Sequence, residues 1–254
     1  MTYAVGTIQR DTINGVPCCV YVPGDMVKAT AKTKKPEVKN KKPATKGKKT
    51  VVNAKQDKQE KYPVLYLHHG MVGSENDWPT SGNIVGIMDT LLRAGKIREM
   101  FIIMPDNCPS RSNWLEEKEN ATNGEWEKQF PQFMAESEAK YPISHEPSKC
   151  AIAGLSMGGY HTMRVATLLD GQFDYVAMFS PATFVHEAPT SPKVFMLAIG
   201  KTDFLYGSFK RYREWLDDHH KEYTYFESTG GHEWVNWQEY IRRFLPKLFL
   251  ENER

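Results

Sequence analysis

A serine stands between two glycines in the stretch Gly154-Leu-Ser156-Met-Gly158. The apolar run 150–153 before it predicts a buried strand, and residues 160–169 after it alternate at roughly helical spacing. A serine on such a strand-to-helix turn forms a nucleophile elbow, with its hydroxyl projecting above the edge of a sheet. Gly154 and Gly158 remove side chains that would collide with the neighbouring strand and helix. Because the pattern is common, an ordinary turn that holds a serine is the alternative.

A serine hydroxyl becomes a good nucleophile when a base takes its proton, and an imidazole with a pKa of about 6.5 does this at neutral pH. A carboxylate on the second ring nitrogen fixes the tautomer and stabilises the cation. In folds with a nucleophile elbow, the acid and then the histidine follow the serine, each on a loop after a strand. Asp203 follows the buried run 194–199, and His232 lies in a glycine-flanked loop after the last expected strand. We therefore predict Ser156 as nucleophile, Asp203 as acid and His232 as base.

Other histidines fit the role of base less well. His219 and His220 have charged neighbours in an expected helix and should be exposed, and His161 should point away from the sheet edge. His68 and His69 are expected to pack and hydrogen-bond near the end of a strand. The alternative for the predicted acid, Asp203, is a helix N-cap.

A second loop is expected to face the elbow. The continuous apolar run 64–67 predicts a strand inside a two-sided sheet. It ends at His68-His69-Gly70-Met71, where Gly70 lets the backbone turn. The N–H of Met71 and the N–H of Met157, the residue after the serine, are then the predicted oxyanion donors.

Strands and helices alternate along the chain. The expected strands are 7–9, 16–22, 64–67, 100–104, 150–153, 175–179, 194–199 and 223–227, and the expected helices are 84–94, 126–141, 160–169, 210–220 and 234–250. Asn14-Gly15 predicts a hairpin between the first two strands. This order predicts one α/β domain over residues 1–254, with a mostly parallel sheet, helices on both faces and an N-terminal β-hairpin.

One segment differs from the rest of the chain in charge. Residues 28–61, the Lys-rich segment, hold 13 Lys against three acidic residues, leaving 20 basic and 28 acidic residues elsewhere. The segment lacks the apolar residues of a core, so we expect a disordered surface insertion. The alternative is an arm that contacts polyanions. Nucleic acid is not the expected partner, because no aromatic residues interleave the lysines to stack on bases.

Composition and residue spacing limit the remaining classes of protein and of site. The chain has no run of 18 apolar residues, so no membrane span is predicted. Residues 1–5 lack the layout of a signal peptide. We therefore expect a cytoplasmic protein, although a secreted chain trimmed of its signal would look the same. Cys18, Cys19, Cys108 and Cys150 lack metal-ligand spacing, so neither a metal site nor a disulfide framework is expected. Cys18, Cys19 and Cys150 are expected as small buried hydrophobes.

Five stretches occur in a specific order. They are YPVLYLHHG at 62–70, GSENDW at 73–78, AGLSMGGY at 153–160, GKTDFLY at 200–206 and GHEW at 231–234. Together they resemble the putative-esterase family of α/β hydrolases, which includes bacterial feruloyl, acetyl-xylan and tributyrin esterases. The resemblance runs from about residue 62 to 250 and implies the α/β-hydrolase fold. It also implies the triad Ser156, Asp203 and His232, with oxyanion donors on Met71 and Met157.

The resemblance implies a serine carboxylesterase that works through an acyl-enzyme without metal or cofactor. Trp78, Trp114 and Trp234 are expected to bind substrate, because flat rings suit an aromatic acyl group or a sugar. The segment between Pro181 and Lys193 is shorter than is usual in the family, which suggests an open site. The expected substrates are feruloyl or acetyl esters of plant-wall carbohydrate. Alternatives are a short-chain, tributyrin-type esterase, an S-formylglutathione-type thioesterase or acyltransferase, and a non-catalytic binding protein on the same fold.

Overall fold

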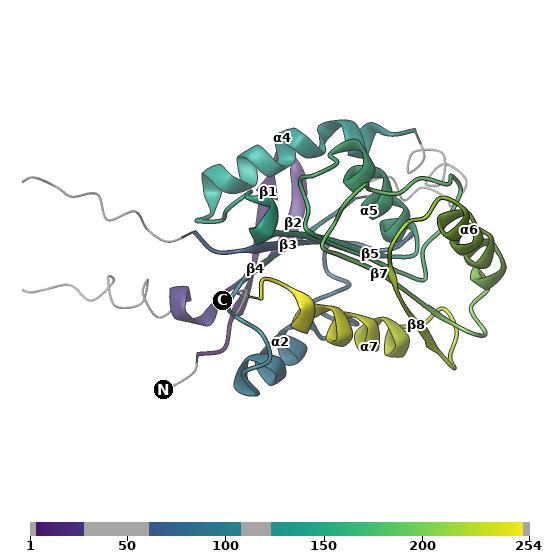
Figure 1. The fold of residues 1–254 in the computed structure, drawn as a ribbon. Coiled ribbons are helices and arrows are strands. Elements are labelled where there is room, and N and C mark those ends of the chain that lie inside the picture. The colour runs from purple at the N-terminus through teal and green to yellow at the C-terminus, as the bar shows by residue number, and fades with distance from the viewer. Residues whose placement is uncertain (1–3, 28–60, 108–122, 251–254) are drawn as a thin grey trace, which may run out of the picture.

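The computed structural model describes residues 4–27, 61–107 and 123–250, and one eight-stranded sheet runs through these ranges (Figure 1). The strands are β1 (Thr7–Ile13), β2 (Val16–Val22), β3 (Val64–His68), β4 (Phe101–Pro105), β5 (Cys150–Leu155), β6 (Tyr175–Phe179), β7 (Val194–Gly200) and β8 (Thr224–Ser228). Their order is β1-β2-β4-β3-β5-β6-β7-β8. β1 and β4 run antiparallel to β2, and the other neighbouring pairs are parallel. The predicted mostly parallel sheet with an N-terminal hairpin is confirmed.

Helices cover both faces of the sheet, as predicted. They are α2 (Ile84–Arg93), α4 (Glu125–Lys140), α5 (Met157–Leu168), α6 (Tyr206–Asp218) and α7 (Trp234–Phe244). α4, α5 and α6 lie on one face, and α2 and α7 on the other (Figure 1). Strand β3 shows why its sequence is apolar throughout. Val64 and Tyr66 pack into the core on the first face, whereas Leu65 and Leu67 pack into the core on the second.

The hairpin between β1 and β2 turns on the two predicted residues. Asn14 and Gly15 have φ values of 49° and 75°, which a two-residue turn of type I′ requires. The expected first strand, 7–9, was too short. β1 continues to Ile13, because each of its residues pairs with β2 and Ile13 is itself buried in the core.

Three helices have an end that lies three or more residues from the predicted one, and the first is α5, which begins at Met157 rather than at residue 160. α6 begins at Tyr206 rather than at residue 210, because the Tyr206 N–H already donates to the Asp203 carbonyl. α7 ends at Phe244 rather than at residue 250. A short 3₁₀ turn follows it, in which Pro246 has no N–H to continue the helix.

Some predictions concern residues outside the described ranges. The Lys-rich segment lies there except for Lys61, and so do Trp114 and Cys108. Cys18, Cys19 and Cys150 have buried thiols, as predicted. No helix within the described ranges is both long and apolar enough to cross a membrane.

Candidate active site

Ser156 stands on the sharp turn between β5 and α5. Its φ of 54° and ψ of −117° lie outside the regions that L-residues ordinarily occupy, so the turn is strained. A Cβ at Gly154 would lie 2.3 Å from the Gly158 carbonyl oxygen. A Cβ at Gly158 would lie 2.2 Å from the His69 carbonyl oxygen. The prediction that these glycines prevent collisions with the helix and the neighbouring strand is confirmed.

The structure brings together the three side chains selected as nucleophile, base and acid. Ser156 follows β5, Asp203 follows β7 and His232 follows β8. The Oγ of Ser156 lies 2.9 Å from Nε2 of His232. Nδ1 of His232 lies 2.9 and 3.0 Å from the two carboxylate oxygens of Asp203. Because an ionised carboxylate only accepts, Nδ1 carries the proton and Nε2 can accept the serine hydroxyl.

Asp203 is buried but stays ionised. Burial alone would raise the pKa of its carboxyl group, but hydrogen bonds from His232 and from the backbone N–H of Leu205 more than offset this and lower it. The same carboxylate therefore holds the loop before α6, through the Leu205 N–H, and orients the imidazole. It can also stabilise an imidazolium at neutral pH.

The loop that follows β3 lies against the elbow. A Cβ at Gly70 would lie 3.2 Å from the Cβ of Ser156, so the Gly70 backbone passes directly beside the serine. Among the described residues, no acceptor takes a hydrogen bond from the N–H of Met71 or from the N–H of Met157, the first residue of α5. Both N–H groups are thus free to bind an anion near Ser156. Their role as oxyanion donors stays a prediction, which this arrangement supports.

The predicted tryptophans lie in different environments. Trp78 is 1% exposed, and its Nε1 donates to the His68 carbonyl at 3.0 Å. This position contradicts the prediction that Trp78 lines the substrate site, because the ring is a core residue beneath the loop. Trp234 is half-buried and packs edge-on against Trp78 at 5.3 Å. Trp237 is buried, and its ring contacts the imidazole of His232 at 4.9 Å.

Phe204 is a candidate functional residue that sequence reasoning missed. It is 76% exposed, and its ring centroid lies 4.4 Å from the centroid of the His232 imidazole. Phenyl rings are usually buried inside a protein, and one this exposed is typical of a binding surface. Its place beside Asp203 in GKTDFLY was the available signal, because the acid loop must approach the base.

Other exposed apolar side chains are also close in sequence to residues of the site. Val72 follows Met71, and Val235 lies three residues after His232. Phe184 lies two residues after Ala182, whose N–H donates to the Ser156 carbonyl at 2.9 Å. Four of the seven exposed large hydrophobic residues in the described ranges thus lie close in sequence to residues of the site.

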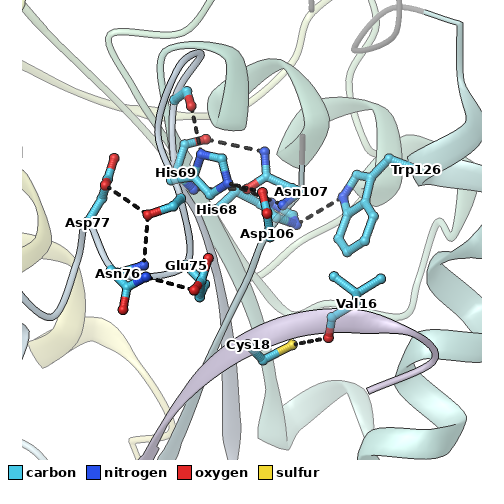
Figure 2. A network of polar contacts seen from close by, with 12 residues as sticks. Val16, Cys18, His68, His69, Glu75, Asn76, Asp77, Asp106, Asn107 and Trp126 are labelled. Carbon is cyan, nitrogen blue, oxygen red and sulfur yellow. Dashed lines mark hydrogen bonds and ion pairs between the residues drawn. The ribbon is translucent and has the colours of Figure 1, made fainter. Parts of the chain in front are cut away.

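Two buried histidines, His68 and His161, lie in the core near the elbow. Trp126 Nε1 donates to Nε2 of His68 at 3.2 Å, so the proton of His68 is on Nδ1 and is shared with Thr162 Oγ1 (Figure 2). Burial, reinforced by the neighbouring histidines, holds the pKa of His68 well below 6.5 and keeps it neutral. His161 pairs with Glu127 in the core at 2.9 Å, away from Ser156. The expectation that His68 packs and hydrogen-bonds is confirmed, and neither histidine is the base.

The described side chains form an acyl-transfer arrangement. It comprises a serine, a base in contact with it, an ionised acid behind the base and two free N–H groups. Within residues 4–27, 61–107 and 123–250, no group of three or more His, Cys, Asp or Glu side chains is arranged to hold a metal ion.

Comparison with known proteins now identifies the family. The esterase family model, described as "Putative esterase", matches residues 43–218, more than two thirds of the chain. The chain belongs to this esterase family. The matched range contains Ser156 and Asp203 and ends before His232, so the base comes from the structure. The predicted family is confirmed.

Two curated relatives support the assignment. An endo-1,4-beta-xylanase/feruloyl esterase of Xylanibacter ruminicola is 26% identical over 196 residues, covering 76% of this chain and 27% of that protein. An acetyl esterase of Caldicellulosiruptor saccharolyticus is 23% identical over 237 residues, covering 74% of this chain and 83% of that protein. The esterase chain therefore spans only about a quarter of the first relative.

Solved structures share the fold of this esterase. The CE1 ferulic acid esterase of Anaeromyces mucronatus superposes with a TM-score of 0.72 at 20% identity, covering 98% of this chain and 92% of that one. The S-formylglutathione hydrolase FrmB of Staphylococcus aureus gives 0.71 at 16% identity, covering 98% and 99%. These likenesses confirm the predicted α/β-hydrolase fold.

Proposed function

We propose that this chain is a serine carboxylesterase that works through an acyl-enzyme. The observation that carries the proposal is the unbroken line of contacts from Ser156 Oγ through His232 to the Asp203 carboxylate. The esterase-family match supports the same class of reaction. A non-catalytic binding protein would not need the strained serine backbone or the buried, ionised acid.

Acylation begins when Oγ of Ser156 attacks the carbonyl carbon of the ester. Nε2 of His232 accepts the hydroxyl proton as the new C–O bond forms, and Asp203 stabilises the imidazolium. The N–H groups of Met71 and Met157 hold the oxyanion of the tetrahedral intermediate. When it collapses, the ester C–O bond breaks and Nε2 returns the proton to the departing alcohol. The acyl group remains on Ser156.

Deacylation repeats these steps with water as the nucleophile. Nε2 of His232 takes a proton from the water that attacks the acyl carbonyl, and the same N–H groups hold the second oxyanion. The bond to Ser156 Oγ then breaks, and the serine recovers its proton from the imidazolium. The products are a free carboxylic acid and the unmodified esterase.

The proposed substrates are feruloyl or acetyl esters of plant-wall carbohydrate. The names of the two curated relatives support these acyl groups. The exposed ring of Phe204 beside His232 offers a flat apolar surface on which an aromatic acyl group or a sugar can stack. Trp234 provides a second, half-buried ring near the base.

Thioester hydrolysis is the second candidate. The fold of FrmB, an S-formylglutathione hydrolase, matches this esterase along almost its whole length. The proposed steps need only a carbonyl carbon and a leaving group that accepts a proton, so a thiol can replace the alcohol.

A substrate panel tests the proposal. It contains methyl ferulate, an acetylated xylo-oligosaccharide, S-formylglutathione and a long-chain acyl ester, each measured with the wild type and with Ser156→Ala. We expect the highest kcat/KM for one of the two plant-wall esters and no turnover by the variant. A long-chain ester that gave the highest value would contradict the substrate class, and a thioester that did so would establish the second candidate.

A further inference from the structure

His69 holds the backbone of the loop that passes Ser156 (Figure 2). Its imidazole is 1% exposed, and Nδ1 lies 2.6 Å from the carbonyl oxygen of Gly70. A carbonyl oxygen only accepts, so Nδ1 carries a proton and donates it there. The N–H of Gly73 donates to the same oxygen at 3.2 Å. The Gly70 carbonyl is therefore fixed by two donors.

Fixing this carbonyl also fixes the neighbouring N–H. The peptide group between Gly70 and Met71 is planar and trans, so its C=O and N–H bonds point in opposite directions. Because the carbonyl of Gly70 points toward the imidazole of His69, the N–H of Met71 points away from it. The direction of the proposed oxyanion donor is thus set by a side chain that has no contact with the substrate.

The imidazole is itself held by the end of the adjacent strand, β4. Nε2 of His69 accepts the N–H of Asn107 at 3.2 Å and so carries no proton, and Oδ1 of Asp106 lies 3.3 Å from it without accepting a hydrogen bond from it. The side-chain amide of Asn107 clamps the His69 backbone, accepting its N–H at 3.1 Å and donating to its carbonyl at 3.3 Å. All three side chains are buried (Figure 2). Buried polar groups with several partners keep one orientation.

The surrounding backbone is shaped to admit this imidazole. A Cβ at Gly73 would lie 2.8 Å from Nδ1 of His69, so a side chain there would push the ring off the Gly70 carbonyl. A residue that only filled space would need neither the proton on Nδ1 nor the N–H donor at Nε2.

We propose that His69, held by Asn107, is a positioning residue of the oxyanion hole. It orients the Met71 N–H and contacts no reacting atom. This inference rests on the proposed function, since it gives that N–H the task of holding the oxyanion. It predicts that changes at His69 weaken binding of the transition state while binding of the ground-state ester is preserved.

Two substitutions at His69 separate positioning from packing. His69→Phe keeps the ring shape and removes the donor, and His69→Asn replaces Nδ1 with an amide nitrogen that can still donate to Gly70. His145→Phe is the matched control, because it removes another largely buried histidine that bonds to Tyr66 rather than to the loop. For each protein we would measure kcat, KM, thermal unfolding and the Ki of a trifluoromethyl ketone, whose adduct with Ser156 places an oxyanion in the hole.

We expect His69→Phe to lower kcat by at least about tenfold, short of the roughly 10²–10³-fold cost of removing a donor outright. KM should stay within about twofold, and Ki should rise by the factor by which kcat/KM falls. His69→Asn should recover most of the loss, and His145→Phe should match the wild type. If His69→Phe does not fold, Asn107→Ala gives the same test with a smaller rise in Ki, because the Asn107 amide clamps the His69 backbone.

Different results would overturn the positioning role of His69 and the proposed function. Wild-type kcat and Ki in His69→Phe, or equal losses in His69→Phe and His69→Asn, would overturn the positioning role while Ser156→Ala remained inactive. Activity retained by Ser156→Ala would instead overturn the proposed function itself.

Discussion

Two histidine–aspartate pairs lie close to the Ser156 elbow, and their ring nitrogens face opposite kinds of partner. In the first pair, Nδ1 of His232 faces Asp203 and Nε2 faces the serine hydroxyl. In the second, Nε2 of His69 faces Asp106 and Nδ1 faces a backbone carbonyl. The same residue types therefore serve as a base in one pair and as a backbone anchor in the other. The roles differ because the ring nitrogen that faces away from the aspartate meets the serine hydroxyl in His232 and a backbone carbonyl in His69.

Exposure separates the two pairs as well. The His232 side chain is 16% exposed, so its Nε2 can exchange a proton with substrate and water. His69 is 1% exposed, and both of its ring nitrogens have protein partners. A base has to reach its substrate, whereas an anchor gains from burial because its hydrogen bonds strengthen in a low dielectric.

Removing the base should have the largest effect. We expect His232→Ala to lower kcat for an aryl ester by about 10⁴-fold or more, because no other group can take the serine proton. A variant that kept a tenth of wild-type turnover would show that another group is the base.

Neutralising each acid compares the two pairs directly. Asp203→Asn should cost about 10⁴-fold in kcat, because an amide in place of the carboxylate favours the wrong tautomer of the base. Asp106→Asn should cost no more than about threefold, because Nε2 of His69 accepts the Asn107 N–H and has no proton to give to this carboxylate. Steady-state kinetics on both variants decides the matter, and equal losses would contradict the assignment of different roles.

The acid of the first pair should also make stability depend on pH. The folded-state pKa of Asp203 lies below its ordinary value of 3.8, so its ionised form stabilises the fold above that pH. This contribution is lost as the pH falls through the folded-state pKa. We expect Asp203→Asn to be less stable than the wild type at pH 7, with the difference shrinking toward pH 3. Urea unfolding at both pH values measures it.

Phe204 touches the first pair alone and should affect specificity. Phe204→Ala should lower kcat/KM for methyl ferulate about three- to tenfold, the cost of one aromatic contact, and should affect an acetyl ester less. Phe184→Ala is the matched control, because Phe184 is also exposed but packs on Tyr160 rather than on His232. An equal loss for both esters would mean that Phe204 only supports the imidazole.

Histidines outside both pairs should have the smallest effect. His219 and His220 follow the end of α6 and are exposed, as predicted. We expect His219→Ala and His220→Ala to keep kcat within about twofold, as surface substitutions usually do. Loss of turnover in either variant would show that the base was wrongly chosen.

The sequence predicted the first pair because its signals are local. Glycines flank Ser156, and His232 and Asp203 each follow an apolar strand in the order that the elbow requires. The second pair has no such signal. His69 and Asp106 are 37 residues apart and meet only because β3 and β4 are neighbours in the sheet. Strand order is set by tertiary packing, which residue patterns do not specify.

The tryptophan prediction failed for a related reason. Trp78 follows the loop of the second pair, and its position in the chain is compatible with either a pocket wall or a core ring. The hydrogen bond from its indole to the His68 carbonyl turns the ring inward, and that carbonyl is brought within reach only by the fold. Phe204 shows the reverse case, an apolar residue that the fold leaves exposed beside the base.

Covalent labelling tests the central claim most directly. A fluorophosphonate reacts with a serine only where a base has activated it, so the wild type should gain one adduct, located on Ser156 by peptide mass spectrometry. Ser156→Ala should take up no label and lose ester hydrolysis, and His232→Ala should label far more slowly. An adduct on another serine, or hydrolysis retained by Ser156→Ala, would contradict the account.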